Sequence, residues 1–188
     1  MTPARLRLVV ILAGIAVAGL AMLAWTQPWF ELTLSGTQTL TVSGQDAAPA
    51  LSALGLASLA LLGALSIAGR GVRIALGVVE AAIGILIAVV ASGALTAPVT
   101  ASAGLITETT AISGPESVAA LVTALVVTAW PVVAIAAGVL TTATGAAVLA
   151  TARRWPGPTR KYDTGSRTES GTPVGAWDSL SDGSDPTR

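Results

Sequence analysis

The stretch RIALGVVEAAIGILIAVVA, from Arg73 to Ala91, decides the fold, because it belongs to an apolar run long enough to cross a bilayer. On a helix with ~100° between residues, its small side chains and Glu80 gather on one face. Bulky aliphatic side chains occupy the opposite face. Small faces pack against other helices and bulky faces meet lipid, so Glu80 is predicted to point into a helix bundle.

The composition indicates a membrane protein. The 188 residues are 53% hydrophobic and 11% charged, whereas soluble domains carry roughly 25% charged residues. The chain has no Cys and no His, which excludes disulfides, zinc sites, Cys nucleophiles and imidazole bases. The net charge is zero, so no overall field favours nucleic acid. Nine Arg against one Lys suggest a high-GC genome, such as that of an actinobacterium.

Four apolar runs reach the ~20 residues that a spanning helix needs. The first is predicted to be an uncleaved anchor, because its apolar core exceeds the ~7–15 residues of a signal peptide. The chain therefore divides into an N-terminus, four spans, three connections and a tail: 1–5, 6–25 (first span), 26–47, 48–68 (second span), 69–71, 72–94 (third span), 95–130, 131–152 (fourth span) and 153–188.

The ten basic residues predict the orientation. Arg5 and Arg7 are at the N-terminus, Arg70 and Arg73 lie at the short turn before the third span, and the other six follow the fourth. The two long connections contain none. By the positive-inside rule, both termini and the short turn are cytoplasmic, and the long connections are outside. The expected location is the plasma membrane, crossed several times.

The tryptophans fit this orientation as interfacial anchors. Trp25, Trp29 and Trp130 fall at the predicted outer surface, and Trp155 falls at the inner one. An aromatic belt at both interfaces is typical of membrane proteins.

The first outer connection predicts a small β-hairpin. Residues 30–34 and 39–42 alternate apolar and polar side chains around a turn at 35–38. Because an isolated hairpin is marginal in water, we expect it to lie on the tops of the helices with its apolar side down.

The second outer connection divides in two. Residues 95–112 are rich in Thr, Ser, Ala and Gly and are expected to be mobile. Residues 114–129 are predicted to be helical, with a bend at Trp130-Pro131 before the fourth span. This segment is apolar all round, so the hairpin, the preceding loop or a partner should cover it.

The tail, 153–188, is rich in Pro, Gly, Ser, Thr and charge and is predicted to be disordered. Near its end Trp177 and Leu180 are three residues apart, so one helical turn would align them. They form a candidate docking motif, or else an unselected aromatic in a linker.

Glu80 is the candidate intramembrane polar site, with Arg73 and Thr144 as its candidate partners. Burial disfavours a charged carboxylate unless a partner compensates. One interpretation is a proton or cation site, since an acid within a span is by default a functional hypothesis. The other is a polar clasp that sets helix register. We favour the clasp, because coupled transporters usually show several polar groups, repeats or broken helices.

No chemistry of catalysis is visible. The sequence has neither a nucleophile–base pair nor a phosphate-binding loop, so neither enzyme activity nor a cofactor nor a metal is expected. Four carboxylates in the outer connections could gather a cation but are better explained as a solvated surface: Glu31, Asp46, Glu108 and Glu116.

Sparse motifs along residues 1–163 resemble the actinobacterial tryptophan-associated transmembrane protein family, whose four-span members have no assigned biochemistry. The matching pieces are QPWFELTLSG after the first span, TVSGQDAAPAL at the second, and AWPVVAIAAGV and RRWPGPTRKYD at the two ends of the fourth. The resemblance implies an association with tryptophan biosynthesis genes and supplies no catalytic residues.

The favoured prediction is an all-α integral membrane protein, a four-helix transmembrane bundle with a small outer hairpin, that acts as an accessory, scaffold or regulatory subunit. Its expected partners are the lipid bilayer and a membrane or cytoplasmic protein, with a homo-oligomer left open and no nucleic acid. The alternative is a small proton- or cation-coupled transporter of an amino acid or amphiphile that uses Glu80. A third option, an envelope protein of claudin-like layout, is an analogy of topology alone.

Overall fold

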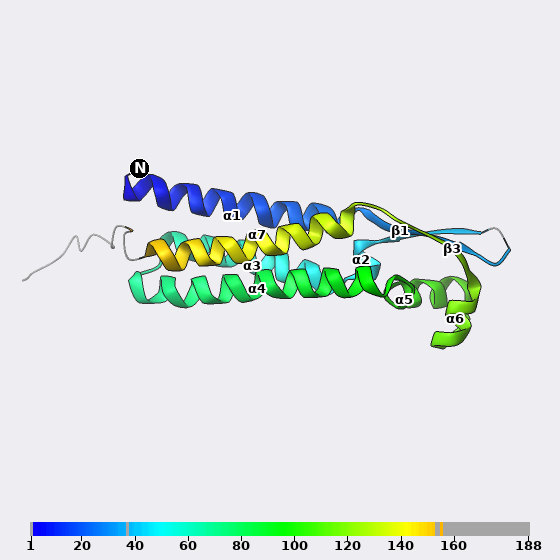
Figure 1. The fold of residues 1–188 in the computed structure, drawn as a ribbon. Coiled ribbons are helices and arrows are strands. Elements are labelled where there is room, and N and C mark those ends of the chain that lie inside the picture. Colours follow the sequence, from blue (N-terminus) through cyan, green and yellow to red (C-terminus); the bar gives the residue numbers. More distant parts are fainter. Residues whose placement is uncertain (1, 37, 153–154, 156–188) are drawn as a thin grey trace, which may run out of the picture. The chain divides into compact units, whose positions relative to one another are not determined.

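The structure is a computed structural model that describes residues 2–36, 38–152 and 155. Figure 1 shows long helices side by side, with strands and short helices at one end. In chain order the elements are α1 (Pro3–Thr26), β1 (Pro28–Leu34), β2 (Thr39–Ser43), α2 (Gly44–Ala47), α3 (Ala50–Ile67), α4 (Arg70–Thr96), α5 (Pro98–Thr110), α6 (Pro115–Leu121), β3 (Val122–Val127) and α7 (Trp130–Thr151).

Four of these helices, α1, α3, α4 and α7, are long and apolar enough to cross a membrane, and each predicted span falls on one of them. In the bundle, α4 packs along α7, α1 contacts both α3 and α7, and α3 contacts α4. We call the end that holds the α3–α4 connection the turn end, and the end that holds the strands the sheet end.

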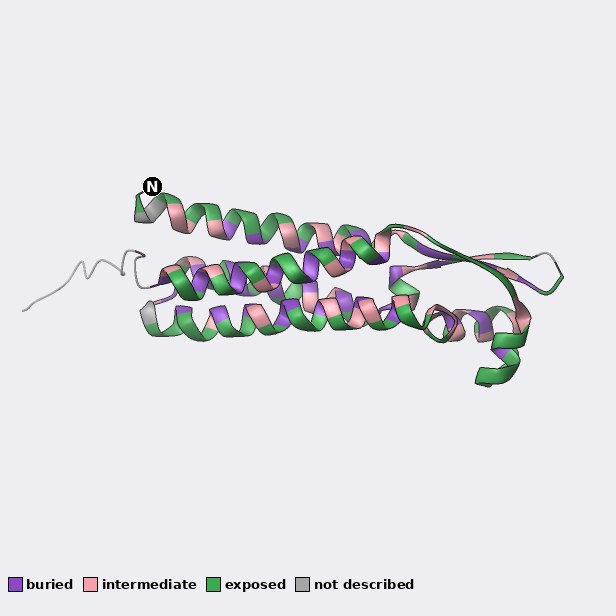
Figure 2. Cartoon of the chain, in the orientation of Figure 1, coloured by how far each residue is buried: buried purple, intermediate pink, exposed green. Residues whose placement is uncertain are grey.

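The outer surfaces of the four helices are apolar and exposed (Figure 2). On α4, Val78, Val79 and Leu86 are exposed, whereas Gly77 and Glu80 are buried. The predicted bulky outward face is confirmed at these positions, whereas the inward side also buries Ile83 and Ile87 beside its small residues. Bulky aliphatic side chains on the outside of a bundle suit a lipid environment rather than water.

The predicted hairpin is present as β1 and β2, and it is part of a three-stranded antiparallel sheet with the order β2-β1-β3. One face of the hairpin is buried through Phe30, Leu32 and Val42, which belong to the same core cluster as Ile106 of α5. Contrary to expectation, the sheet does not lie flat on the helix tops. It continues outward from the ends of α1 and α7, and α5 contacts β2 (Figure 1).

The third strand corrects the prediction of a helix over 114–129. Only Pro115–Leu121 is helical, and Val122–Val127 pairs with β1, with Leu32 opposite Leu125. Four of the six residues of β3 are Val or Thr, whose branched side chains favour strands over helices. The open side of β1 supplies the backbone partners that turn this preference into a strand.

The segment 95–112 is also more regular than predicted. Residues Pro98–Thr110 form α5, which begins with a proline in its first turn and buries Ser102 and Ile106. The Ser102 hydroxyl donates to the Pro98 carbonyl oxygen at 2.7 Å, so this polar side chain is satisfied within its own helix. Packing of α5 against α2 and β2 replaces the expected mobile loop.

Candidate functional site: a buried carboxylate between two helices

Glu80 lies near the middle of α4 with no exposed surface. The hydroxyl of Ser58, on α3, donates a hydrogen bond of 2.7 Å to Glu80 Oε1. Glu80 Oε2 is buried and has no hydrogen-bond partner among the described residues. The site is thus an acid that holds one hydroxyl donor and has one further oxygen enclosed by protein.

Ser58 is a partner that the sequence prediction missed. It lies on the buried face of α3, which also carries Leu51, Gly55, Leu62 and Leu65. A helical-face count of α3 would have shown a hydroxyl among these small and aliphatic residues. The candidate partners named from the sequence, Arg73 and Thr144, belong to α4 and α7, and neither lies on α3.

Thr144, the predicted partner, does not bond to Glu80. Its hydroxyl donates to the Leu140 carbonyl oxygen at 3.0 Å, within α7. Its methyl group faces α1, because a Cβ added at Gly14 would lie 3.0 Å from Thr144 Cγ2. Hydroxyls bonded to the carbonyl one turn earlier are common for Thr in helices and leave little capacity for a distant acid.

Glycines on either side of Glu80 along α4 let this helix approach α7 closely. A Cβ added at Gly84 would lie 2.6 Å from the Gly138 carbonyl oxygen, and one at Gly145 would lie 2.8 Å from the Gly77 carbonyl oxygen. Because side chains larger than hydrogen do not fit here, the two backbones touch. Glycines let membrane helices approach this closely.

Arg73, the other predicted partner, is 2% exposed and lies at the turn end of α4. Its guanidinium carbon is 5.5 Å from the centroid of the Trp155 ring, which is a cation–π arrangement. Arg73 is seven residues, or ~10 Å, from Glu80 along the helix. The structure therefore brings Arg73 to Trp155 and brings Glu80 to Ser58.

The four candidate interfacial tryptophans differ in exposure. Trp25 and Trp130 are half-buried, but Trp29 and Trp155 are covered by protein, with 0% and 2% exposed. Trp29 Nε1 donates to the Ala24 carbonyl oxygen at 2.8 Å, which ties β1 to the end of α1. Trp29 and Trp155 thus act as packing residues at helix ends and do not present their rings to lipid.

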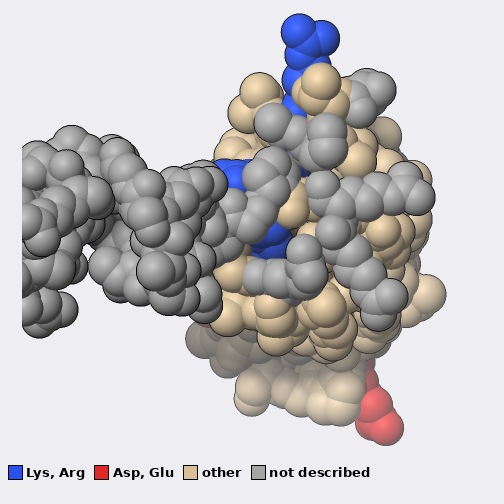
Figure 3. All heavy atoms as spheres, turned by 90° about the vertical axis from the view of Figure 1, so that its left-hand side faces the viewer, with Lys and Arg blue, Asp and Glu red and all other residues tan. Residues whose placement is uncertain are grey.

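Charged side chains divide between the two ends. Figure 3 looks onto the turn end and shows basic side chains there. The described ones belong to the starts of α1 and α4: Arg5, Arg7 and Arg73. Arg7 donates to the Ser66 carbonyl oxygen, which joins α1 to α3 there. Apart from Glu80, the described carboxylates belong to sheet-end elements: Glu31, Asp46, Glu108 and Glu116.

These sheet-end carboxylates do not form a metal site within the described part of the chain, where no group of three or more acidic side chains comes together. Asp46 instead accepts hydrogen bonds from the Ser43 hydroxyl and backbone N–H, at 2.6 and 3.1 Å, and caps α2. The candidate docking residues Trp177 and Leu180 lie outside the described residues.

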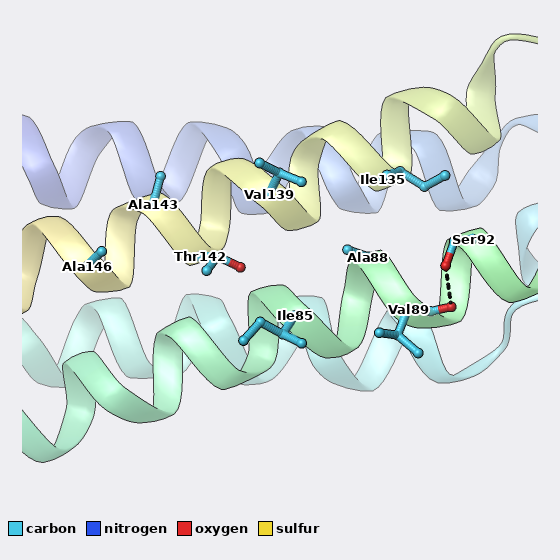
Figure 4. A pocket seen from close by; sticks show the side chains of 9 residues that line it. All are labelled: Ile85, Ala88, Val89, Ser92, Ile135, Val139, Thr142, Ala143 and Ala146. Carbon is cyan, nitrogen blue, oxygen red and sulfur yellow. Dashed lines mark hydrogen bonds between the residues drawn. The ribbon is translucent and has the colours of Figure 1, made fainter.

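A groove of about 590 Å³ lies between α4 and α7 (Figure 4), and Glu80 is not among the residues that line it. Its lining includes aliphatic Ile85, Val89 and Val139 and the hydroxyls of Ser92 and Thr142. Ser92 donates to the Val89 carbonyl oxygen, and Thr142 donates to that of Gly138. The groove therefore presents an apolar surface, as expected for a helix face in hydrocarbon.

Comparison with known proteins gives one family. The family described as tryptophan-associated transmembrane protein matches residues 7–187. No curated protein and no solved structure matches the chain.

Proposed function

Because the chain belongs to the tryptophan-associated transmembrane protein family, we propose that it is a non-enzymatic, multi-pass membrane protein that serves as an accessory, scaffold or regulatory subunit. The proposed location is the plasma membrane, with the turn end and both termini in the cytoplasm and the sheet end outside. The separation of arginines from the sheet-end carboxylates supports this orientation. A link to tryptophan metabolism rests on the family name alone.

One observation carries this proposal: the bundle supports a folded sheet that presents aliphatic side chains beyond the four spans. Leu125, Val126 and Val127 of β3 are exposed there. Exposed aliphatic clusters outside a membrane are typical of surfaces that bind another protein. A second interaction surface is proposed at Trp177 and Leu180 of the tail.

The test is affinity purification of the full chain from its native membranes in mild detergent. A subunit should recover a defined protein at a constant ratio to the chain. A parallel purification of a chain lacking residues 173–188 separates partners of the tail from partners of the sheet. A preparation that contains only this chain, and whose reconstituted vesicles transport a substrate, would contradict the subunit role.

A small proton- or cation-coupled transporter of an amino acid or amphiphile is the second candidate. The observation in its favour is Glu80 Oε2, a buried acid oxygen without a hydrogen-bond partner among the described residues. Acids inside a membrane bundle often mark proton or ion pathways. In this case Glu80→Gln should abolish flux in reconstituted vesicles while the variant purifies and unfolds like the wild type.

A further inference from the structure

The strand β3 is the open edge of the sheet. In the order β2-β1-β3, β1 is central; α2 and α5 contact β2, and α6, the helix that leads into β3, contacts β3. Within the described part of the chain, no strand lies on the other side of β3. An uncovered edge presents backbone donors and acceptors that can pair with another chain.

The side chains of this edge are apolar on both faces. The exposed fractions are 36% for Leu125, 59% for Val126 and 43% for Val127. Beyond the four spans, the only other large aliphatic side chain exposed in the described residues is Ile112. Lipid can cover the exposed aliphatic residues of the spans, whereas those of β3 need another cover.

The hydrogen-bonding register identifies which backbone groups point outward. The Thr128 N–H donates to the Trp29 carbonyl oxygen at 3.0 Å, immediately after β3. In an antiparallel ladder, hydrogen-bonded residue pairs alternate with pairs that are not hydrogen-bonded. Thr128 is bonded to Trp29, so Val126, two residues earlier, is bonded to its partner Glu31 on β1. The N–H and C=O groups of Leu125 and Val127 therefore point to the open side.

Charge gives the chemistry of a suitable partner. Residues 122–127 carry no charge, and the elements around them carry the exposed carboxylates Glu31, Glu108 and Glu116. Residues 26–47 and 95–130 contain no Lys or Arg. An uncharged, β-branched segment with basic residues at its ends would match both the edge and its surroundings.

A second copy of the chain fits this edge poorly. Two copies inserted the same way in one membrane are related by an axis along the membrane normal. Figure 1 shows β1 and β3 running in the same general direction as the four spans. A two-fold axis parallel to the strands turns the sheet of the second copy over. If the two β3 strands paired about this axis, the core face of one sheet would continue as the solvent face of the other.

We propose that β3 binds an extended segment of a partner protein as a fourth strand of the sheet. The backbones of Leu125 and Val127 supply the hydrogen bonds, and the segment is rich in β-branched residues and flanked by Lys or Arg. Main-chain bonds give affinity in such strand addition, and the alternate side chains give selectivity. This inference rests on the proposed subunit function and specifies its binding surface.

The test measures binding of a fluorescent peptide, Lys-Lys-Val-Thr-Val-Thr-Val-Lys-Lys, to the purified full chain in detergent. Saturable binding is expected, and it should weaken about tenfold or more in Leu125→Pro, which removes one outward N–H. Leu125→Lys keeps every backbone N–H and adds a positive charge that repels the lysines of the peptide, so it should also weaken binding. This second variant tests the proposal if the proline variant does not fold.

The matched control is Thr41→Pro at the other edge of the sheet. The Leu34 N–H donates to the Gln38 carbonyl oxygen at 2.8 Å, so the same alternation directs the Thr41 N–H away from β1. This variant should bind the peptide like the wild type. A peptide with glutamates in place of the lysines should bind more weakly.

Several outcomes would overturn the proposal. They are absent binding, equal binding of the acidic peptide, or equal effects of Thr41→Pro and Leu125→Pro. Because the chain has no cysteine, a Leu125→Cys variant that forms disulfide dimers in the membrane would assign the edge to a second copy. If native partners co-purify but the peptide does not bind, the proposal for the β3 edge fails and the subunit function stands. If the peptide binds but no native partner co-purifies, the subunit function is rejected.

Discussion

The Ser58 hydroxyl donates to Glu80 Oε1 across 2.7 Å and joins α3 to α4 inside the bundle. Both residues are fully buried. A polar contact enclosed in this way is costly to break, because the group left behind cannot turn to water.

Removing the donor should destabilise the bundle. Ser58→Ala leaves Glu80 Oε1 without its hydroxyl, and we expect the free energy of unfolding to fall by about 1–3 kcal/mol. Reversible unfolding in mixed micelles would measure this change. The control is Ser66→Ala, since Ser66 is half-buried and its hydroxyl donates to the Gly63 carbonyl oxygen of its own helix. If the free energy of unfolding falls equally in both variants, the Ser58–Glu80 hydrogen bond does not contribute the expected stability.

A substitution can separate a role of Glu80 in proton exchange from its hydrogen bond with Ser58. Glu80→Gln keeps an oxygen that can accept from Ser58 but loses the exchangeable acid proton. Under the clasp interpretation the variant should retain nearly all the stability and partner binding of the wild type, as judged by unfolding and co-purification. Loss of a transport activity from a stable Glu80→Gln protein would instead favour the second candidate function.

The contact between α4 and α7 should not tolerate a methyl group. In Gly84→Ala the new Cβ would meet the Gly138 carbonyl oxygen at 2.6 Å, so the helices must separate. We expect a loss of about 1–3 kcal/mol, the usual cost of overpacking. Gly93→Ala, on the same helix, meets no atom within 4 Å and should be neutral or slightly stabilising. Equal melting temperatures for the two variants would contradict this prediction.

Arg73 and Trp155 should be energetically coupled. A double-mutant cycle with Arg73→Ala and Trp155→Leu should give an interaction energy of about 0.5–2 kcal/mol, as expected for a cation–π pair with little solvent. The cycle is needed because each single change also removes packing. Strict additivity of the two changes in unfolding free energy would show that the ring and the guanidinium do not interact.

Orientation in the membrane can be measured with single cysteines, because the chain has none of its own. Thr109→Cys places a thiol on the exposed face of α5, and Gly71→Cys places one at the turn end. With the sheet end outside, an impermeant maleimide should label the first variant in intact cells and the second only after permeabilisation. The opposite pattern would reverse the proposed topology.

The sequence by itself determined the four spans and the inward face of α4. Both are local properties, since the length of an apolar run and the side on which small residues gather can be counted within one helix. The hairpin pattern of β1 and β2 is local in the same sense, because a short turn joins the two strands. These features needed no knowledge of which segments lie side by side.

Only the tertiary structure decided which segments meet. The Ser58–Glu80 contact joins residues 22 apart, and Thr123 donates to the Thr33 carbonyl oxygen 90 residues away. The run Val122–Val127 is apolar, which is compatible with a buried helix, and it is rich in β-branched residues, which favour a strand. The open side of β1 resolved that choice, because unpaired backbone groups on the central strand are satisfied by a neighbouring strand and not by a helix.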